Sequence, residues 1–279
     1  MTVINTNVNA IQATNASNSA AAMTSQAMTR LSTGLRINSA ADDSAGLAIS
    51  TSMTAQINGM NQGIKNANDG ISMAQTAQGS LTEVTNMLQR IRTLAVQASS
   101  GTYQASDKAD MQSEVDALTG QIGQIVGNTK FNGNTLFSTG ASNASFSIQT
   151  GANSGDSVSL NSVTMTALAS TVGFGSGSTS AFDVTTSPSA TIAKIDTALT
   201  QVSTTDAGLG AGQSELQSAL NNMTSDSTNL TAARSRIQDT DYSAESTALA
   251  KAQILSQAST AMIAQANQAQ QNVLSLVKG

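Results

Sequence analysis

The sequence predicts a mostly α protein: a long antiparallel helical hairpin, packed as a coiled-coil bundle, with a small β-hairpin segment in the middle of the chain. Three observations carry this prediction. Residues 1–187 contain no proline, residues 57–98 repeat apolar side chains every seven positions, and residues 192–237 form a second heptad run. Alternating spacings of three and four over such lengths are typical of a coiled-coil seam.

The first heptad run consists of two lines of apolar residues along residues 57–98. After Ala74 one line shifts by a single residue, which changes the winding locally without ending the helix. The seam residues predicted here are Ile57, Met60, Ile64, Ile71, Leu81, Leu88 and Ile91. Ser39 and Asp42 fit a capping box before this helix, and Asp43 adds negative charge near its N-terminus.

The second heptad run begins after the single proline. Ser187 and Pro188 fit the N-cap and the first position of a helix. The predicted seam residues are Ile195, Leu199, Leu216, Leu220 and Leu230. Gly208, Gly210 and Gly212 weaken the middle of this helix, and we interpret them as a bend or a tight contact.

Shorter elements are predicted between the two runs. A helix is expected over about residues 106–126, capped by Ser106 and Asp107. A β segment is expected near residues 128–166, followed by a short loop rich in Gly and Ser near residues 167–187. Apolar residues alternate in two places within the β segment, at Phe146 and Ile148 and again at Val158 and Leu160. Such alternation on both sides of a turn predicts a hairpin.

Both ends of the chain carry long helical patterns without charge. The first charged residue is Arg30, and none lies between Lys251 and Lys278. Lipid would penalise the many amide side chains, whereas bulk water gives no reason to exclude charge. The remaining environment is a protein interior supplied by other chains. The residues predicted to make these contacts are Ile4, Val8, Ile11, Met23, Leu31, Leu255, Met262, Ala266, Val273 and Leu276.

The composition argues against catalysis, metal binding and nucleic-acid binding. The sequence has no cysteine and no histidine, so thiolate metal sites and the commonest general base are excluded. Its net charge is −5, and the scattered basic residues argue against a nucleic-acid surface. No stretch is apolar enough to span a membrane, and the N-terminus lacks the features of a cleaved signal peptide. We therefore expect no enzyme activity, no metal and no cofactor.

Two pairs of carboxylates suggest alternatives that we weighed. Asp42 and Asp43 could perform acid–base chemistry, and Asp239 and Asp241 could bind a cation. Helix capping and turn formation are favoured at both places, because no nucleophile, phosphate loop or further acidic cluster accompanies either pair.

Several long motifs at both ends carry a resemblance to a known family. They are residues 4–7 (INTN), 31–40 (LSTGLRINSA), 42–49 (DDSAGLAI), 66–72 (NANDGIS), 229–237 (NLTAARSRI) and 272–276 (NVLSL). With these motifs in this order, the sequence resembles bacterial flagellin, the subunit of the flagellar filament. It resembles a short form with the D0 and D1 domains only.

The resemblance implies a structural subunit that self-assembles into a helical tube for swimming motility. Residues 1–38 and 241–279 would form domain D0, and residues 39–240 would form domain D1. The implied partners are further copies of the chain, an export chaperone, a filament cap and hook-junction proteins. The implied location is the flagellum outside the cell, reached through the type III export apparatus without a cleaved signal.

The same resemblance singles out one surface of the first long helix. Arg90, Leu94 and Gln97 share a face off the seam, and a leucine beside an arginine on an outer face indicates a contact surface. In similar flagellins this segment contacts the neighbouring subunit, and the host Toll-like receptor for flagellin recognises it on monomers. The face predicted here consists of Gln89, Arg90, Leu94, Gln97 and Glu114. Subunit packing alone remains the alternative.

Two other functions remain open at this point. A hook–filament junction protein would share these ends but would not form long homopolymers. A surface adhesin or glycan-binding flagellin homologue would need a polar or aromatic binding face, for which residues 131–182 are the candidate.

Overall fold

The computed structural model describes residues 6–137, 144–162, 166–173 and 181–278. The chain divides into two compact units: Met1–Ala55 together with Asn229–Gly279 forms the first, and Gln56–Thr228 forms the second. The helices are α1 (Val8–Thr33), α2 (Ser44–Ala98), α3 (Ala105–Asn128), α4 (Thr166–Val172), α5 (Pro188–Gln238) and α6 (Tyr242–Lys278). Helices α2 and α5 each contribute residues to both units.

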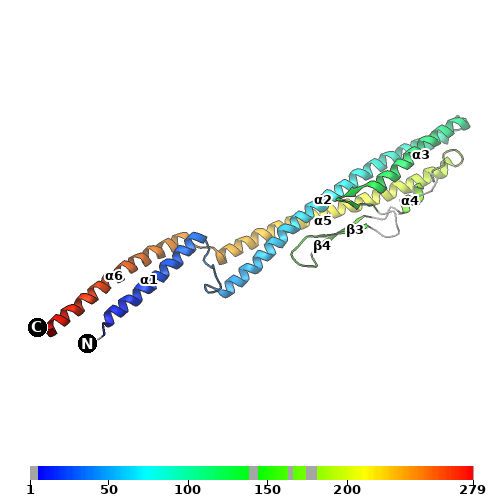
Figure 1. Ribbon diagram of the computed structural model, residues 1–279. Helices are drawn as coiled ribbons and strands as arrows, with labels where there is room; N and C mark the ends of the chain where they lie inside the picture. Colours follow the sequence, from blue (N-terminus) through cyan, green and yellow to red (C-terminus); the bar gives the residue numbers. More distant parts are fainter. Residues whose placement is uncertain (1–5, 138–143, 163–165, 174–180, 279) are drawn as a thin grey trace. The chain divides into compact units, whose positions relative to one another are not determined.

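In the second unit, α2, α3 and α5 lie side by side (Figure 1). Three side-chain hydrogen bonds between α2 and α5 show the relative direction of the two helices. From one bond to the next, the residue number on α2 rises while the residue number on α5 falls. Ser227 donates to Asn61 at 3.3 Å, Gln213 to Gln78 at 2.8 Å and Arg92 to Asp196 at 2.8 Å. The two helices are therefore antiparallel, which confirms the predicted helical hairpin.

The core of the second unit is formed largely by the heptad positions of α2 and α5. Leu81, Leu88 and Ile91 of α2 and Ile195 and Leu216 of α5 are almost fully buried. Of the other predicted seam residues, Ile57 is buried. The remaining ones are partly buried: Met60, Ile64, Ile71, Leu199, Leu220 and Leu230. Leu230 belongs to the first unit.

Along α5, small residues lie deeper than some of the large ones. Ala198 and Thr205 are fully buried, whereas Leu199 packs only at the edge of the core. Gly212 is buried as well, and a Cβ built on it would stand 2.4 Å from Cδ2 of Leu160. The interpretation of the glycine triplet as a tight contact is thus confirmed at Gly212.

Two small antiparallel sheets lie between α3 and α4 in the sequence. Strands β1 (Lys130–Phe131) and β2 (Asn134–Thr135) pair with each other, as do β3 (Ala144–Gln149) and β4 (Ser157–Ser162). In the second sheet Phe146 lies opposite Leu160, and Ile148 lies opposite Val158. The alternation in the sequence predicted this hairpin, and the structure confirms it.

The β3–β4 hairpin approaches the backbone of α2 at glycines. A Cβ on Gly63 would stand 2.9 Å from the carbonyl C and O of Thr150, which follows β3. A Cβ on Gly59 would stand 2.9 Å from Cα of Ala152 in the turn. Because backbone atoms cannot move aside as a flexible side chain does, these glycines are needed for the close approach.

Helix α2 starts four residues later than the predicted capping box suggests, because Ser39 is not its N-cap. Asp43 is its N-cap, because its carboxylate accepts a hydrogen bond from the backbone N–H of Gly46 at 2.9 Å. The carboxylate of Asp42 instead accepts from the hydroxyl and the backbone N–H of Ser39, at 3.0 and 2.9 Å. These bonds, led by that of the hydroxyl, lower the pKa of Asp42. Both carboxylates are thus used locally, in a turn and a cap.

Two shorter elements also differ from the expectation. The N-cap of α3 is Gln104 rather than Ser106, and its backbone N–H donates to the carboxylate of Asp107 at 3.0 Å. Where the sequence predicted the start of a Gly/Ser-rich loop, the structure has helix α4. Its residues Leu168 and Val172 lie one turn apart and are both buried in the core of the second unit, which holds this segment in a helix.

The segment before α5 is tied to α3 by one glutamine. Gln112 donates to the carbonyl of Phe182 and accepts from the N–H of Val184, both at 2.8 Å. Both partners are fully buried. Between them, the carboxylate of Asp183 accepts hydrogen bonds from the hydroxyl of Thr185 and from the backbone N–H of Thr186. These bonds hold the pKa of Asp183 well below its usual range.

Candidate self-assembly surfaces

Helices α1 and α6 lie side by side within the first unit (Figure 1). Asn7 caps α1 through its side-chain oxygen, which accepts from the N–H of Ala10 at 3.0 Å, while its amide nitrogen donates to the carbonyl of Ala266 at 3.0 Å. Near the other end of α1, the hydroxyl of Tyr242 donates to the carbonyl of Leu31 at 3.1 Å. The two helices are therefore antiparallel, and α6 continues beyond the start of α1.

Residues 34–43 link α1 to α2, and residues 239–241 link α5 to α6; we call these the interhelical links. Hydrogen bonds at these links support the antiparallel arrangement of α1 and α6. The N–H of Arg36 donates to the carbonyl of Gln238 at 2.7 Å, and its guanidinium donates to that of Ile237 at 2.7 Å. The N–H of Thr240 donates to the carbonyl of Gly34 at 2.9 Å. Gly34 has φ of 72°, a left-handed conformation that ends α1.

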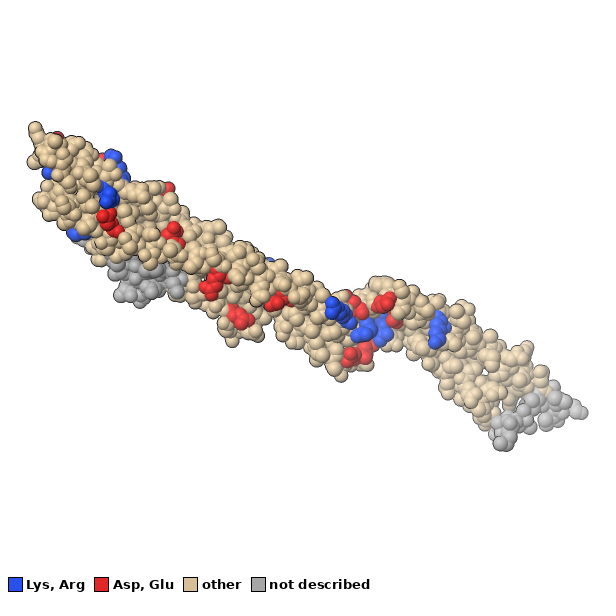
Figure 2. Space-filling model, turned by 180° about the vertical axis from the view of Figure 1, so that it is seen from behind, with Lys and Arg blue, Asp and Glu red and all other residues tan. Residues whose placement is uncertain are grey.

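The buried residues described on α1 and α6 are small. They are Ala20, Ala27, Ala252 and Ser259. Large apolar side chains remain exposed on the same helices: Val8, Ile11, Met23, Met28, Ile254, Leu255 and Met262. Charged side chains gather near the interhelical links, and the terminal part of the pair shows none on the face in Figure 2. An uncharged surface of this kind indicates a protein interface.

The structure gives the following positions for the predicted contact residues. Val8, Ile11, Met23, Leu255 and Met262 are exposed, and Leu31 and Ala266 are partly buried. Ile4 lies outside the described residues, and for Val273 and Leu276 only the helical backbone is described. The prediction missed Met28 and Ile254, because they lie off the heptad lines. Their position within or beside an uncharged segment is the signal that could have identified them.

The second candidate surface lies on α2 and α3 in the second unit. The guanidinium of Arg90 donates to the carboxylate of Glu114 at 2.8 Å, and this hydrogen bond, with the opposite charge, raises the pKa of Arg90. Gln97 donates to the hydroxyl of Tyr103 at 3.1 Å, and Gln89 is exposed.

Leu94 does not lie on this exposed face. It is only 3% exposed and belongs to the core cluster that α2 shares with α3 and α5. The expectation of Leu94 on an outer face is therefore wrong. The helical period places it near Arg90, but α2 is covered on two sides in this unit, so its buried stripe is wider than the seam of a two-helix coiled coil.

Comparison with known proteins identifies the family. A family model of the bacterial flagellin N-terminal helical region matches residues 4–143, and one of the bacterial flagellin C-terminal helical region matches residues 192–277. The chain belongs to the bacterial flagellin family. It is 41% identical over 302 residues to flagellin of Bacillus subtilis (strain 168), covering 99% of each chain.

Two further comparisons place this flagellin among filament proteins. It is 40% identical over 260 residues to the flagellar filament 33 kDa core protein of Treponema phagedenis, covering 90% of this chain and 91% of that protein. It is also similar to the crystal structure of Bacillus cereus flagellin, with 32% identity and a TM-score of 0.50. That match covers 61% of this chain and 94% of the other. Flagellin is a structural protein family.

Of the two carboxylates near the start of α6, Asp241 caps the helix and Asp239 binds a hydroxyl at the end of α5. Asp241 accepts from the N–H groups of Ser243 and Ala244 at 2.9 and 3.2 Å, and Asp239 accepts from the hydroxyl of Ser235 at 2.6 Å. Within the described part of this flagellin, no group of three or more acidic residues is arranged to hold a metal ion. The described helices also include none with the length and apolarity needed to cross a membrane.

Proposed function

We propose that this chain is the structural subunit of a bacterial flagellar filament and polymerises into a helical tube for swimming. One observation carries the proposal: α1 and α6 bury small residues and leave large apolar ones exposed in largely uncharged segments. Full burial of an exposed large apolar side chain is worth about 1.5–3 kcal/mol, and because these side chains are about half exposed, each would contribute roughly half of that to an assembly.

Further copies of the same chain are the partner that fits this surface best. A copy supplies the same uncharged helices, and heterologous contacts that do not close into a ring give a helical filament. We assign residues 1–38 and 241–279 to the inner domain D0 and residues 39–240 to the outer domain D1. These bounds differ from those of the two compact units because α2 and α5 cross between the units.

The route to the filament is part of the same proposal. We propose that the chain leaves the cell through the flagellar type III apparatus without a cleaved signal. An export chaperone would bind its C-terminal segment, and cap and hook-junction proteins would contact it in the flagellum.

Seeded polymerisation tests the filament proposal. Purified chain is mixed with short filament fragments, and growth is followed by electron microscopy. We expect long filaments from the intact chain and none after removal of residues 242–279, because the truncation deletes one of the two exposed apolar helices. Circular dichroism of the truncated chain checks that the second unit remains folded.

Other outcomes would favour the alternative functions. Soluble monomers or short rings from the intact chain would contradict the filament proposal. They would instead support a hook–filament junction protein, or a surface adhesin or glycan-binding homologue.

We also propose that the face around Arg90 and Glu114 is recognised by the host Toll-like receptor for flagellin. The exposed ion pair and the neighbouring glutamines give this face several hydrogen-bonding groups. In a receptor-reporter assay on monomers, we expect Arg90→Asp to lower potency by about tenfold or more, because it reverses a charge in the contact.

Arg92 offers a matched control for this experiment. Its guanidinium donates to the carboxylate of Asp196 on α5 at the same 2.8 Å, so Arg92→Asp also breaks an exposed ion pair. We expect that variant to retain nearly full potency. Equal responses to Arg90→Asp and the unchanged chain would mean that the face serves subunit packing alone.

A further inference from the structure

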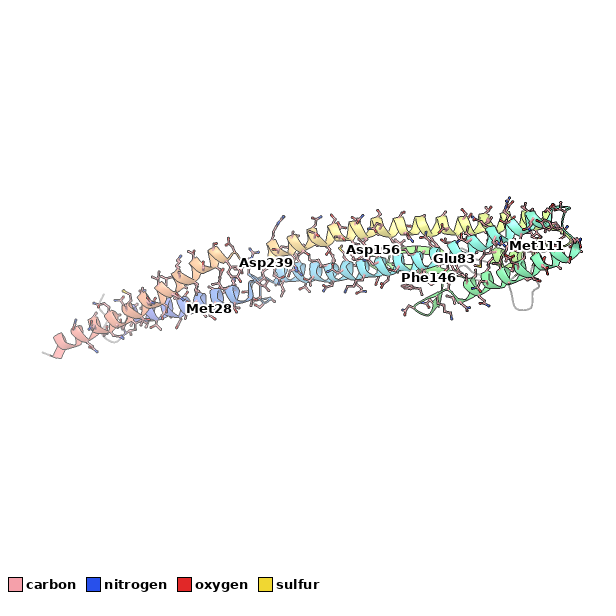
Figure 3. The ribbon with its side chains drawn as sticks, turned by 90° about the horizontal axis from the view of Figure 1, so that it is seen from above. Met28, Glu83, Met111, Phe146, Asp156 and Asp239 are labelled. Carbon is pink, nitrogen blue, oxygen red and sulfur yellow. The ribbon has the colours of Figure 1, made fainter. Side chains whose placement is uncertain are left out.

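The methionines that the structure describes differ widely in exposure, and Met53, Met60 and Met87 are partly buried. The sequence has 11 methionines and no cysteine, so methionine provides all of its sulfur. Met73, Met111 and Met223 are buried in the core of the second unit. By contrast, Met23 is 42% exposed, Met28 58% and Met262 61%. Among the described residues, these three exposed methionines all lie on α1 or α6, and Figure 3 shows Met28 on α1.

Exposure on these two helices has a chemical consequence. In the reaction of methionine with hydrogen peroxide, the thioether sulfur attacks one peroxide oxygen, and the O–O bond breaks. The sulfur is oxidised by two electrons to the sulfoxide, and the peroxide is reduced to water. The product replaces a flexible apolar group by a polar one that needs a hydrogen-bond donor when it is buried.

The surroundings of the three methionines make this change costly in an assembly. Their segments are largely uncharged, and other large residues of the same helices, Ile11, Ile254 and Leu255, are also apolar and exposed. A copy packed against such a surface buries the sulfur atoms among apolar groups. A sulfoxide at the same place lacks a partner unless water enters the interface.

We infer that Met23, Met28 and Met262 are sites of peroxide oxidation in free subunits, and that their oxidation stops filament growth. This inference rests on the proposed function, because it needs α1 and α6 to be buried between copies. Subunits within a filament are protected, since the contact that requires the thioethers also covers them. Oxidation therefore acts on the supply of subunits and leaves assembled filaments intact.

The test combines peptide mass spectrometry with seeded growth. Monomers treated with hydrogen peroxide should gain 16 Da, the mass of one oxygen atom, at Met23, Met28 and Met262 before Met73, Met111 and Met223 react. We expect seeded elongation of these monomers to fall by about tenfold or more, and a methionine sulfoxide reductase to restore it. Peroxide-treated filaments should remain unmodified at the three sites.

A triple variant separates these sites from other effects of peroxide. Met23→Leu, Met28→Leu and Met262→Leu together preserve volume and apolarity, so the variant should elongate equally well with and without peroxide. If peroxide inhibits the variant as strongly as the unchanged chain, the inference is overturned. Normal elongation of fully oxidised unchanged monomers overturns it too. Failure of untreated monomers to elongate would instead contradict the proposed function and the inference with it.

Discussion

A chain carrying Ile11→Asp is expected to remain monomeric when filament seeds are added. Ile11 is 52% exposed on α1, so the monomer loses little burial on substitution. In the proposed assembly the side chain becomes buried in a segment without any charged partner. Burial of an unpaired carboxylate costs about 3 kcal/mol or more, which corresponds to a loss of subunit affinity of about 100-fold or more.

The measurement is the critical concentration for seeded growth, read from the protein left in solution after filaments are pelleted. Ile11→Leu is the matched control, because it keeps an apolar side chain of the same volume and should assemble nearly as the unchanged chain does. The helical circular dichroism signals of both monomers should agree. Normal assembly of Ile11→Asp would show that this face of α1 stays exposed in the polymer.

The second large effect is expected at Gly63, where α2 meets the end of β3. A Cβ on Gly63 would stand 2.9 Å from the backbone of Thr150 and also 2.9 Å from Sδ of Met223 on α5. Gly63→Ala should therefore force the hairpin away from α2. We expect the free energy of unfolding to fall by about 1–3 kcal/mol, as in other overpacked cores.

Gly79, in the same helix, provides the control for Gly63. A Cβ there meets no described atom within 4 Å, so Gly79→Ala should stabilise the chain by about 0.5–1 kcal/mol through helix propensity alone. Urea unfolding followed by circular dichroism measures both variants. If both substitutions changed the free energy of unfolding equally and in the same direction, the close approach of the hairpin to α2 would be contradicted.

Much of the secondary structure follows from local patterns. The start of α5 at Pro188 and the hairpin of β3 and β4 agree with the sequence prediction. These features depend on the fixed φ of proline and on the period of two in a strand, which act over a few residues. Helix caps were less predictable. Ser39 was predicted as the N-cap, but it donates to Asp42 in a turn, and Asp43 caps α2. Several residues that can cap a helix lie close together there, and only the path of the chain decides which one does.

Side-chain burial was harder to predict where a helix has several neighbours. A heptad pattern assumes one partner helix, and it correctly marked Leu88 and Ile195 as core positions. It placed Leu94 outside, although the side chain is buried, and it did not recognise Ala198 and Thr205 as deep positions. Small and polar residues give a weak hydrophobic signal, so contacts made through them are visible only when the third element is in place.

The sequence by itself therefore determined the helical hairpin, the β-hairpin and the uncharged ends of the chain. Periodicity and charge are local properties, and they persist whatever the chain packs against. Only the tertiary structure showed that α1 and α6 bury alanines and leave methionines exposed, and that α2 needs glycine where β3 ends. Which side of a helix is covered, and how closely, depends on the distance between segments that are remote in the sequence.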